Sequence, residues 1–175
     1  MQLTSRARRA IPLPLTEDQS ADMIYPDDLP YSPRLPRKSQ FDVCDEGSMG
    51  RGIRTKVAFG RGSVIAEFTG QFTSQILQHT LQVTPTSHVH DPYFIGLLSH
   101  SCAPNSLLDM QGMELLALCD IPAGTLLTVD YALTEDILFR QFPCDCGASN
   151  CRSWITGRRE KVNAKGRRHL AKRQH

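Results

Sequence analysis

Short apolar runs, separated by glycine, proline or polar residues, recur along the chain from residue 41 onwards. The clearest runs cover residues 57–59, 64–68, 115–119 and 126–131. Runs of this length, rich in Val, Ile, Phe and Tyr, are typical of short β-strands. Residues 75–81 form the one candidate helix in the middle of the chain. The pattern therefore predicts a mainly β domain whose strands are brief.

The two ends of the chain depart from this pattern. Residues 1–38 contain six prolines and little apolar periodicity, which predicts an extended or disordered arm. Residues 158–175 carry eight Lys and Arg against one Glu, and form a basic tail. Between the ends we place a domain at 39–140 and a cysteine-rich segment at 141–157. No apolar run approaches the roughly 18 to 20 residues of a membrane span, so we expect an intracellular, cytoplasmic protein.

Charge is distributed unevenly along the 175 residues, although the net formal charge is only +2. Residues 45–157 hold eleven acidic side chains against six Lys and Arg, whereas the tail is strongly positive. An acidic body suits a cationic substrate, and a basic tail suits nucleic acid. A solvated acidic surface and a frayed, basic C-terminal end are the alternatives that composition leaves open.

The stretch least like a core strand or a linker is residues 99–105, Ser-His-Ser-Cys-Ala-Pro-Asn. It combines a thiol, an imidazole and two hydroxyls with a turn-forming Pro-Asn pair. This composition indicates a functional site. Two later stretches are candidates to converge on it: Thr-Val-Asp-Tyr at 128–131 and Cys-Asp-Cys-Gly-Ala-Ser-Asn-Cys at 144–151.

Three of the six cysteines, Cys144, Cys146 and Cys151, lie close together in the second of these stretches. Their spacing places three thiols on one tight turn, as in a zinc knuckle. Without a secretory signal, an even number of cysteines does not imply disulfides. Redox chemistry is the alternative interpretation of the cluster. We expect Cys44 and Cys119 to be a surface thiol and a core residue.

Together these stretches resemble the SET-domain protein lysine methyltransferases, of the small, stand-alone, bacterial type. That family shows an Asn-His-Ser-Cys-x-Pro-Asn turn, a Thr-x-Asp-Tyr strand end and a post-SET Cys-x-Cys-Gly-x-x-x-Cys cluster. Residues 50–52 and 62–70 match its opening motifs, and the resemblance runs from about Cys44 to Gly157. It implies a mainly β SET-domain (β-clip-like) fold, with several small sheets and a pseudoknot-like crossing of the Tyr131 segment.

The same resemblance implies an activity, the transfer of methyl groups from S-adenosylmethionine to a lysine amine of a basic protein or peptide. Tyr131 falls at the catalytic position, and Val129 falls in the lysine channel, where a small side chain leaves room for more than one methyl group. Cys102 would complete a zinc site with Cys144, Cys146 and Cys151. The residues that would contact the cofactor are Gly50, Arg51, Gly52, Ser99, His100, Phe142 and Trp154.

Several positions differ from the family or allow a second interpretation. Ser99 stands where the family has Asn, Gly96 where it has Arg, and Arg51 where it has an aromatic residue. Phe142 and Trp154 flank the cysteines and could instead belong to the core. The alternative function is therefore a catalytically weak or inactive, zinc-stabilised SET-like module that binds a basic peptide or a nucleic-acid-associated partner. The basic tail is a candidate for nucleic-acid contact.

Overall fold

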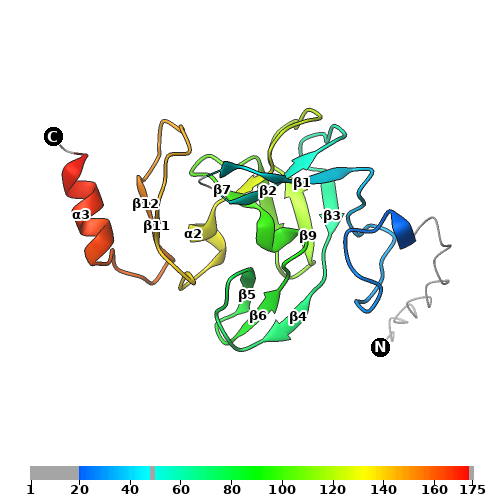
Figure 1. The fold of residues 1–175 in the computed structure, drawn as a ribbon, viewed down its shortest axis with the longest axis horizontal. Coiled ribbons are helices and arrows are strands. Elements are labelled where there is room, and N and C mark those ends of the chain that lie inside the picture. The colour runs from blue at the N-terminus through cyan, green and yellow to red at the C-terminus, as the bar shows by residue number, and fades with distance from the viewer. Residues whose placement is uncertain (1–19, 48–49, 174–175) are drawn as a thin grey trace, which may run out of the picture.

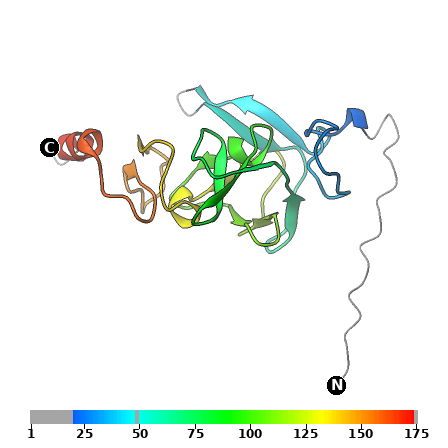
Figure 2. The same ribbon diagram turned by 90° about the horizontal axis from the view of Figure 1, so that it is seen from below.

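A computed structural model of the chain describes residues 20–47 and 50–173. Residues 1–19 of the predicted arm and residues 174–175 of the predicted tail lie outside the described residues. Figure 1 shows a β-rich body with the first described residues at one end and helix α3 at the other. Figure 2, turned by 90°, shows the same order of parts.

The body is built from short strands, because glycine, proline and polar residues interrupt each apolar run. The strands are β1 (Phe41–Asp45), β2 (Arg51–Thr55), β3 (Val64–Glu67), β4 (Gln71–Thr73), β5 (Thr80–Thr84), β6 (Ser87–His90), β7 (Ser99–His100), β8 (Ser106–Asp109), β9 (Glu114–Ala117), β10 (Thr128–Val129), β11 (Phe142–Pro143) and β12 (Trp154–Ile155). The helical segments are the 3-10 turn η2 (Ile95–Leu97) and the α-helices α2 (Tyr131–Thr134) and α3 (Ala164–Lys172).

The strands pair into several small sheets. Antiparallel pairing gives the hairpins β1-β2 and β11-β12 and the three-stranded sheets β3-β9-β8 and β4-β6-β5. Strands β7 and β10 differ, because they are distant in sequence and pair in parallel. This pair brings the 99–105 turn beside the strand that leads to Tyr131. The prediction of a mainly β fold with several small sheets is confirmed.

One large apolar core joins the sheets of the body, and a smaller cluster around Cys102, Leu138, Cys144 and Ile155 packs under the β11-β12 hairpin. Burying each large side chain of the main core stabilises the fold by roughly 1.5–3 kcal/mol. The described part of the proline-rich arm contributes to this core, since Met23, Tyr25 and Leu35 are buried there. Residues 20–38 therefore pack against the domain. The largest fully buried side chains of this core include Phe41, Ile53, Phe94, Leu98, Leu115, Ile121 and Leu127.

Residues 75–81 do not form a helix, so that prediction is wrong. The hydroxyl of Thr80 accepts a hydrogen bond from the Leu77 amide (3.0 Å) and donates one to the Leu77 carbonyl (2.8 Å). His79 lies in the left-handed region, with φ of 67°. A threonine that satisfies backbone groups locally competes with helix formation. The segment therefore turns and enters β5 at Thr80.

The C-terminal segment forms a helix that docks on the β11-β12 hairpin. The Asn163 side chain caps α3 by accepting from the Gly166 amide at 2.9 Å. Gly166 lies so close to Trp154 that a Cβ at this position would collide with the indole nitrogen. The His169 ring adds a contact, with its centroid 5.5 Å from that of Trp154. None of the described helices is both long and apolar enough to cross a bilayer.

Candidate active site and metal centre

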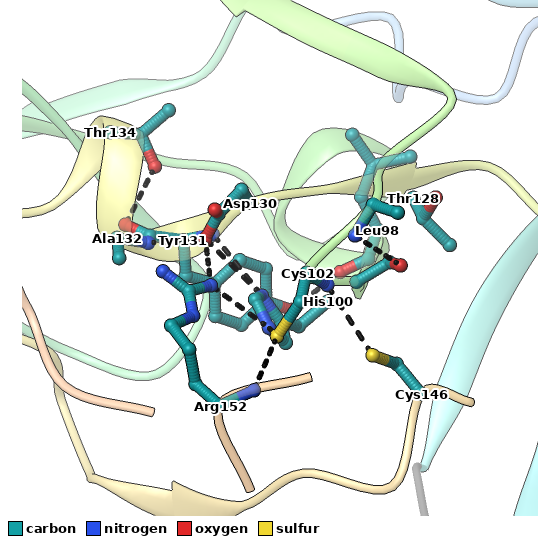
Figure 3. A network of polar contacts seen from close by, with 12 residues as sticks. Leu98, His100, Cys102, Thr128, Asp130, Tyr131, Ala132, Thr134, Cys146 and Arg152 are labelled. Carbon is teal, nitrogen blue, oxygen red and sulfur yellow. Dashed lines mark hydrogen bonds and ion pairs between the residues drawn. The ribbon is translucent and has the colours of Figure 1, made fainter. Parts of the chain in front are cut away.

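The parallel pair of β7 and β10 forms the floor of the candidate site. Ser99 lies opposite Thr128 and His100 opposite Val129, and the pairing continues where the Ser101 amide donates to the Val129 carbonyl at 3.0 Å. Figure 3 shows His100, Cys102 and Tyr131 brought together from these two segments. The sequence stretches 99–105 and 128–131 therefore converge, as expected.

Asn105 locks the turn to β10 through its side chain. Its amide group donates to the Leu126 carbonyl at 2.8 Å, and its side-chain oxygen accepts from the Thr128 amide at 2.8 Å. Ser106 adds a bond to the Thr128 carbonyl at 2.8 Å. The Asn105 side chain thus bonds one backbone carbonyl and one backbone amide of the opposite segment, as a neighbouring strand would. These bonds fix the position of the turn, which explains the place of Asn at the end of the motif.

Tyr131 begins α2, directly after Asp130, whose side chain caps the helix by accepting from the Ala132 amide at 3.0 Å. The Tyr131 hydroxyl donates to the Leu98 carbonyl at 2.5 Å. Burial raises the pKa of Tyr131 to about 12, and the nearby Glu135 charge adds to the effect. The phenol is therefore neutral at physiological pH and held in one orientation.

Three rings, including that of Tyr131, meet edge to face beside the 99–105 turn. The His100 centroid lies 5.3 Å from Tyr131 and 5.7 Å from Phe142, and the Tyr131 and Phe142 centroids are 5.8 Å apart. Such T-shaped pairs are a preferred aromatic geometry. The cluster joins β7, α2 and β11, and so links the turn to the cysteine-rich segment.

His100 is uncharged in this cluster, because burial lowers its pKa to about 4. Its Nδ1 accepts from the Tyr131 amide at 3.3 Å. Beside the ring, Arg152 donates to Asp130 at 2.5 Å (Figure 3). The ion pair between Arg152 and Asp130 was not predicted from the sequence, although Asp130 stands within the Thr-x-Asp-Tyr motif.

The four cysteines Cys102, Cys144, Cys146 and Cys151 converge, with all sulfur atoms within 4.8 Å of one another. Zinc with four thiolates at about 2.3 Å places the sulfurs about 3.8 Å apart in a tetrahedron, so the arrangement fits that ion. Two backbone amides donate to these sulfurs: the Cys102 N–H to the Cys146 sulfur (3.5 Å) and the Arg152 N–H to the Cys102 sulfur (3.4 Å). Amide donors of this kind stabilise thiolates. Donor set and geometry both fit structural zinc.

The first glycine motif lies beside the floor of the site. Gly50 has a φ of 81°, a left-handed conformation that favours glycine. The Arg51 side chain is exposed. A Cβ at Gly52 would lie 2.8 Å from Leu126 Cδ1 and 3.1 Å from Ser99 Oγ. The Ser99 hydroxyl is buried and has no hydrogen-bond partner among the described residues. A buried orphan hydroxyl facing a glycine is the feature expected where a ligand approaches the backbone.

The other predicted residues lie at different distances from this cluster. Val129 is 1% exposed and belongs to the apolar core. Trp154 is turned towards α3, and its indole nitrogen donates to Gln141 at 3.1 Å. Phe142 is therefore the aromatic residue of the cysteine-rich segment that reaches the ring cluster. For Trp154 the contacts match the core interpretation that the sequence left open.

Gly96, which stands in place of the family's Arg, has a structural reason to be glycine. A side chain there would collide with the Asp91 carbonyl and would place its Cβ 2.8 Å from Cβ of His79. The Gly96 carbonyl lies 2.7 Å from the His79 ring. Asp91 in turn is fully buried and accepts from three backbone amides and from the Tyr25 hydroxyl. This buried network takes up the space that the Arg would need.

Comparisons with known proteins show which proteins the chain is similar to. No family model matches the chain. Human histone-lysine N-methyltransferase 2D is 33% identical over 78 residues, which covers 39% of this chain and 1% of that protein. Methyltransferase flvH of Aspergillus flavus is 29% identical over 107 residues, covering 59% and 60%. Histone-lysine N-methyltransferase ash1 of Drosophila melanogaster is 27% identical over 150 residues, covering 73% and 7%.

Solved structures share the fold. A crystal structure of KRYPTONITE in complex with mCHG DNA and SAH matches with a TM-score of 0.56 and 23% identity, over 65% of this chain and 28% of that one. The methyltransferase domain of human histone-lysine N-methyltransferase SETMAR matches with a TM-score of 0.52 and 22% identity, over 67% and 58%. The chain thus spans less than two thirds of each of these relatives. By its motifs, its fold and these similarities, the chain resembles the SET-domain lysine methyltransferases.

Proposed function

We propose that the chain is an S-adenosylmethionine-dependent methyltransferase that acts on a lysine amine of a protein or peptide. The observation that carries the proposal is the position of Tyr131, whose hydroxyl is fixed on the Leu98 carbonyl inside the ring cluster. Methyl transfer requires alignment of two reacting atoms and no covalent intermediate. A rigid hydroxyl beside a carbonyl oxygen, which can accept weak C–H hydrogen bonds, suits that task.

The cofactor would lie between β2 and the 99–105 turn. Gly52 and Ser99 approach each other closely there, and the orphan Ser99 hydroxyl would pair with a polar group of its methionine part. His100 and Phe142 would offer ring surface to adenine. Bound there, S-adenosylmethionine supplies an electrophilic methyl group. The SAH in the KRYPTONITE structure supports this choice of cofactor.

The substrate lysine must reach the site uncharged. A free lysine has a pKa of about 10.4, so holding it neutral at pH 7 costs about 4 to 5 kcal/mol. An apolar channel lowers that pKa by desolvation. Tyr131 helps because its raised pKa keeps the phenol neutral, so it places no negative charge beside the amine. Val129 is buried in the core beside Tyr131, and if the channel reaches it, its small side chain would leave room for more than one methyl group.

A zinc ion on Cys102, Cys144, Cys146 and Cys151 would serve structure and not chemistry. Four thiolates close the coordination shell of zinc, so no open position remains for a substrate. Cys102 belongs to the 99–105 turn, and the other three follow Phe142 in sequence. The ion would therefore hold the cysteine-rich segment, with its Phe142 ring, against the turn.

The partners that fit this proposal are a lysine-containing basic protein or peptide and, through the basic C-terminal segment, nucleic acid. A related KRYPTONITE structure holds an H3(1-15) peptide and DNA, which supports both classes of partner. A binding module without turnover is the weaker alternative, because Tyr131 is present and ordered as a catalytic residue would be.

Titration calorimetry with S-adenosylmethionine, followed by a methyl-transfer assay on a mixed histone substrate, tests the proposal. We expect binding and turnover in the wild type. The variant Tyr131→Phe should lose turnover by a large factor and keep cofactor affinity within a few fold, since the ring still packs. Tyr93→Phe, at a 40% exposed tyrosine, is the matched control. A Tyr131→Phe variant as active as the wild type would contradict the assigned role.

A further inference from the structure

Helix α3 is held rigidly on the β11-β12 hairpin, which distinguishes it from a solvated tail. Three sets of contacts fix it: a hydrogen bond from the Asn163 backbone N–H to the Gln141 side chain at 3.0 Å, the Gly166 and His169 contacts with Trp154, and an ion pair from Arg173 to Asp145 at 2.7 Å. These contacts lie near the start, the middle and the end of the helix. The orientation of its opposite, outward side is therefore defined.

Three basic residues form a ridge on that outward side. Lys165, Arg168 and Lys172 are all exposed, and their spacing of three and four residues places them along one face of a helix. At 1.5 Å per residue the ridge is about 10 Å long. Ala164 and Ala171, also exposed, lie beside it. Two small residues next to the ridge let the helix backbone approach a binding partner closely.

No acidic side chain offsets the charge of this ridge in the described part of the chain. The helix itself contains no Asp or Glu. The ion pairs of the C-terminal segment use Arg158, Arg159 and Arg173, and none of them involves Lys165, Arg168 or Lys172. The ridge is therefore a local concentration of positive charge on a chain whose net formal charge is only +2.

We propose that this ridge, Lys165, Arg168 and Lys172, binds the phosphate backbone of duplex nucleic acid. The charge is complementary to phosphates, and a helix of this diameter fits against or into a major groove of about 12 Å. A membrane surface fits less well, because an interfacial helix needs an apolar face open to lipid and α3 turns its Gly166, His169 and Leu170 side towards the hairpin. The ridge would give affinity without sequence specificity, since it offers contacts to phosphates alone.

Binding at this ridge deepens the proposed function by naming the residues that would contact nucleic acid, yet it does not depend on methyl transfer. Helices α3 and α2, the second of which begins at Tyr131, lie on opposite sides of the β11-β12 hairpin (Figure 1). A substrate associated with nucleic acid, as a basic protein often is, would be brought near the enzyme by this contact. Nucleic-acid binding at the ridge and methyl transfer can be tested separately, because the first is measured by binding and the second by turnover.

The test is fluorescence anisotropy of a labelled DNA duplex with the full chain, over roughly 50 to 200 mM salt. We compare the wild type with the triple variant Lys165→Gln, Arg168→Gln, Lys172→Gln. Each neutralised phosphate contributes about 0.9 to the slope of log affinity against log salt. We therefore expect the triple variant to lower that slope by about 2 to 3 and to weaken binding at least about tenfold at the lower salt concentration.

The matched control removes the same charge elsewhere, by Lys38→Gln, Lys56→Gln and Arg61→Gln, all at exposed positions. This control should bind DNA like the wild type. An equal loss in the control would mean that net charge alone drives binding, and would overturn the proposal. So would binding to vesicles of anionic phospholipid with none to DNA. Methyl transfer to a short peptide should be the same in all three proteins.

Discussion

At the scale of single residues, the most informative contact in the site joins Ser99 to Gly52. The Ser99 hydroxyl is buried without a partner among the described residues, and a buried unsatisfied polar group costs about 1 to 3 kcal/mol. The fold can tolerate such a group where a ligand supplies the missing bond. The serine is shorter than the family's Asn, and so the ligand must come closer to β7.

A variant at Gly52 tests this contact. In Gly52→Ala the new methyl group would lie 2.8 Å from Leu126 and 3.1 Å from the Ser99 hydroxyl, so it would fill the space beside that hydroxyl. We expect calorimetry to show at least a tenfold loss of S-adenosylmethionine affinity, about 1.4 kcal/mol. Gly60→Ala is the control, because nothing lies within 4 Å of its Cβ and it should bind normally. Unchanged affinity in Gly52→Ala would place the cofactor elsewhere.

Single residues were predictable where one short motif contains all that the chemistry needs. Cys144, Cys146 and Cys151 could be identified as a cluster from their spacing, and Tyr131 from its motif. The Leu98 carbonyl and the space around Gly96 could not be predicted, because both depend on how distant backbone segments pack. Every residue has a backbone carbonyl, so the sequence does not indicate which one the Tyr131 hydroxyl will bond. The reason for glycine instead of Arg at position 96 is visible only when the position of the Asp91 carbonyl is known.

At the scale of elements, the cysteine-rich segment is held from two sides, by the cysteine cluster and by α3. Hairpin β11-β12 is only two residues long on each side, and a hairpin of that size is not stable alone. We therefore attribute the stability of the segment to these two attachments. Loss of either should loosen Phe142 and the ring cluster.

Removal of one cysteine tests the first attachment. Cys144→Ser should lower the zinc content, measured by elemental analysis, from about one ion per chain to well below that, since three thiolates leave the shell incomplete. Thermal unfolding should shift down by at least about 5 °C, as roughly 2 kcal/mol does in a domain of this size. Cys119 is exposed and not the core residue expected from the sequence, and it lies outside the cluster, so Cys119→Ser should change neither quantity. Wild-type protein without zinc would rule out the metal centre.

A second link joins β5 to the end of α2. The backbone N–H of Gln82 donates to both carboxylate oxygens of Glu135, at 3.1 and 3.2 Å. The Gln82 side chain bonds Asp136 twice: its Nε2 donates to Oδ2 of Asp136 (3.0 Å), and its Oε1 accepts from the Asp136 backbone N–H (2.6 Å). Burial raises the pKa of Glu135 from its usual 4.5 to about 7. The folded state therefore holds a proton on this carboxyl that the unfolded state releases.

This link predicts a pH dependence of stability. Because the folded pKa is the higher one, the contribution of Glu135 is most favourable below about pH 4.5 and is lost as pH rises to about 7, by up to about 3 kcal/mol. Glu135→Gln keeps an oxygen acceptor without the charge, so its stability in urea titrations should exceed that of the wild type at pH 8 and converge with it at low pH. Asp28→Asn, at an exposed carboxyl, is the control. Parallel pH profiles for wild type and Glu135→Gln would refute the assignment.

Elements were predictable where a short apolar run decides the structure, as in β3 with its β-branched Val64 and Ile65 and in β9 with Leu115 and Leu116. The turn at 75–81 was missed because the Thr80 side chain satisfies the Leu77 backbone, a local effect that helix propensity does not include. The docking of α3 was also hidden. It relies on the absence of a side chain at Gly166 and on a histidine against Trp154, and so the helix shows no apolar stripe.

At the scale of the whole molecule, the charges are separated along its length. The acidic excess lies in residues 45–157, and the basic excess lies in the C-terminal segment at the far end of the molecule (Figure 1). A basic tail next to an acidic body could in principle fold back into the lysine channel and inhibit it. The docked helix argues against that, because its contacts with Trp154 and Asp145 commit it to the outer side of the hairpin.

Deletion of residues 163–175 separates these two views. Docking on the hairpin predicts that the truncated chain exposes Trp154, which is 8% exposed in the full chain. Its fluorescence should shift to the red, and its unfolding temperature should fall. The apparent KM for a basic peptide at low salt should stay the same, because the channel loses no competitor. Self-inhibition predicts the opposite: a lower KM after truncation, and loss of a methyl label that the intact chain places on Lys165 or Lys172. A Trp154 spectrum unchanged by truncation, together with a lower KM, would show that α3 leaves the hairpin and occupies the channel in solution.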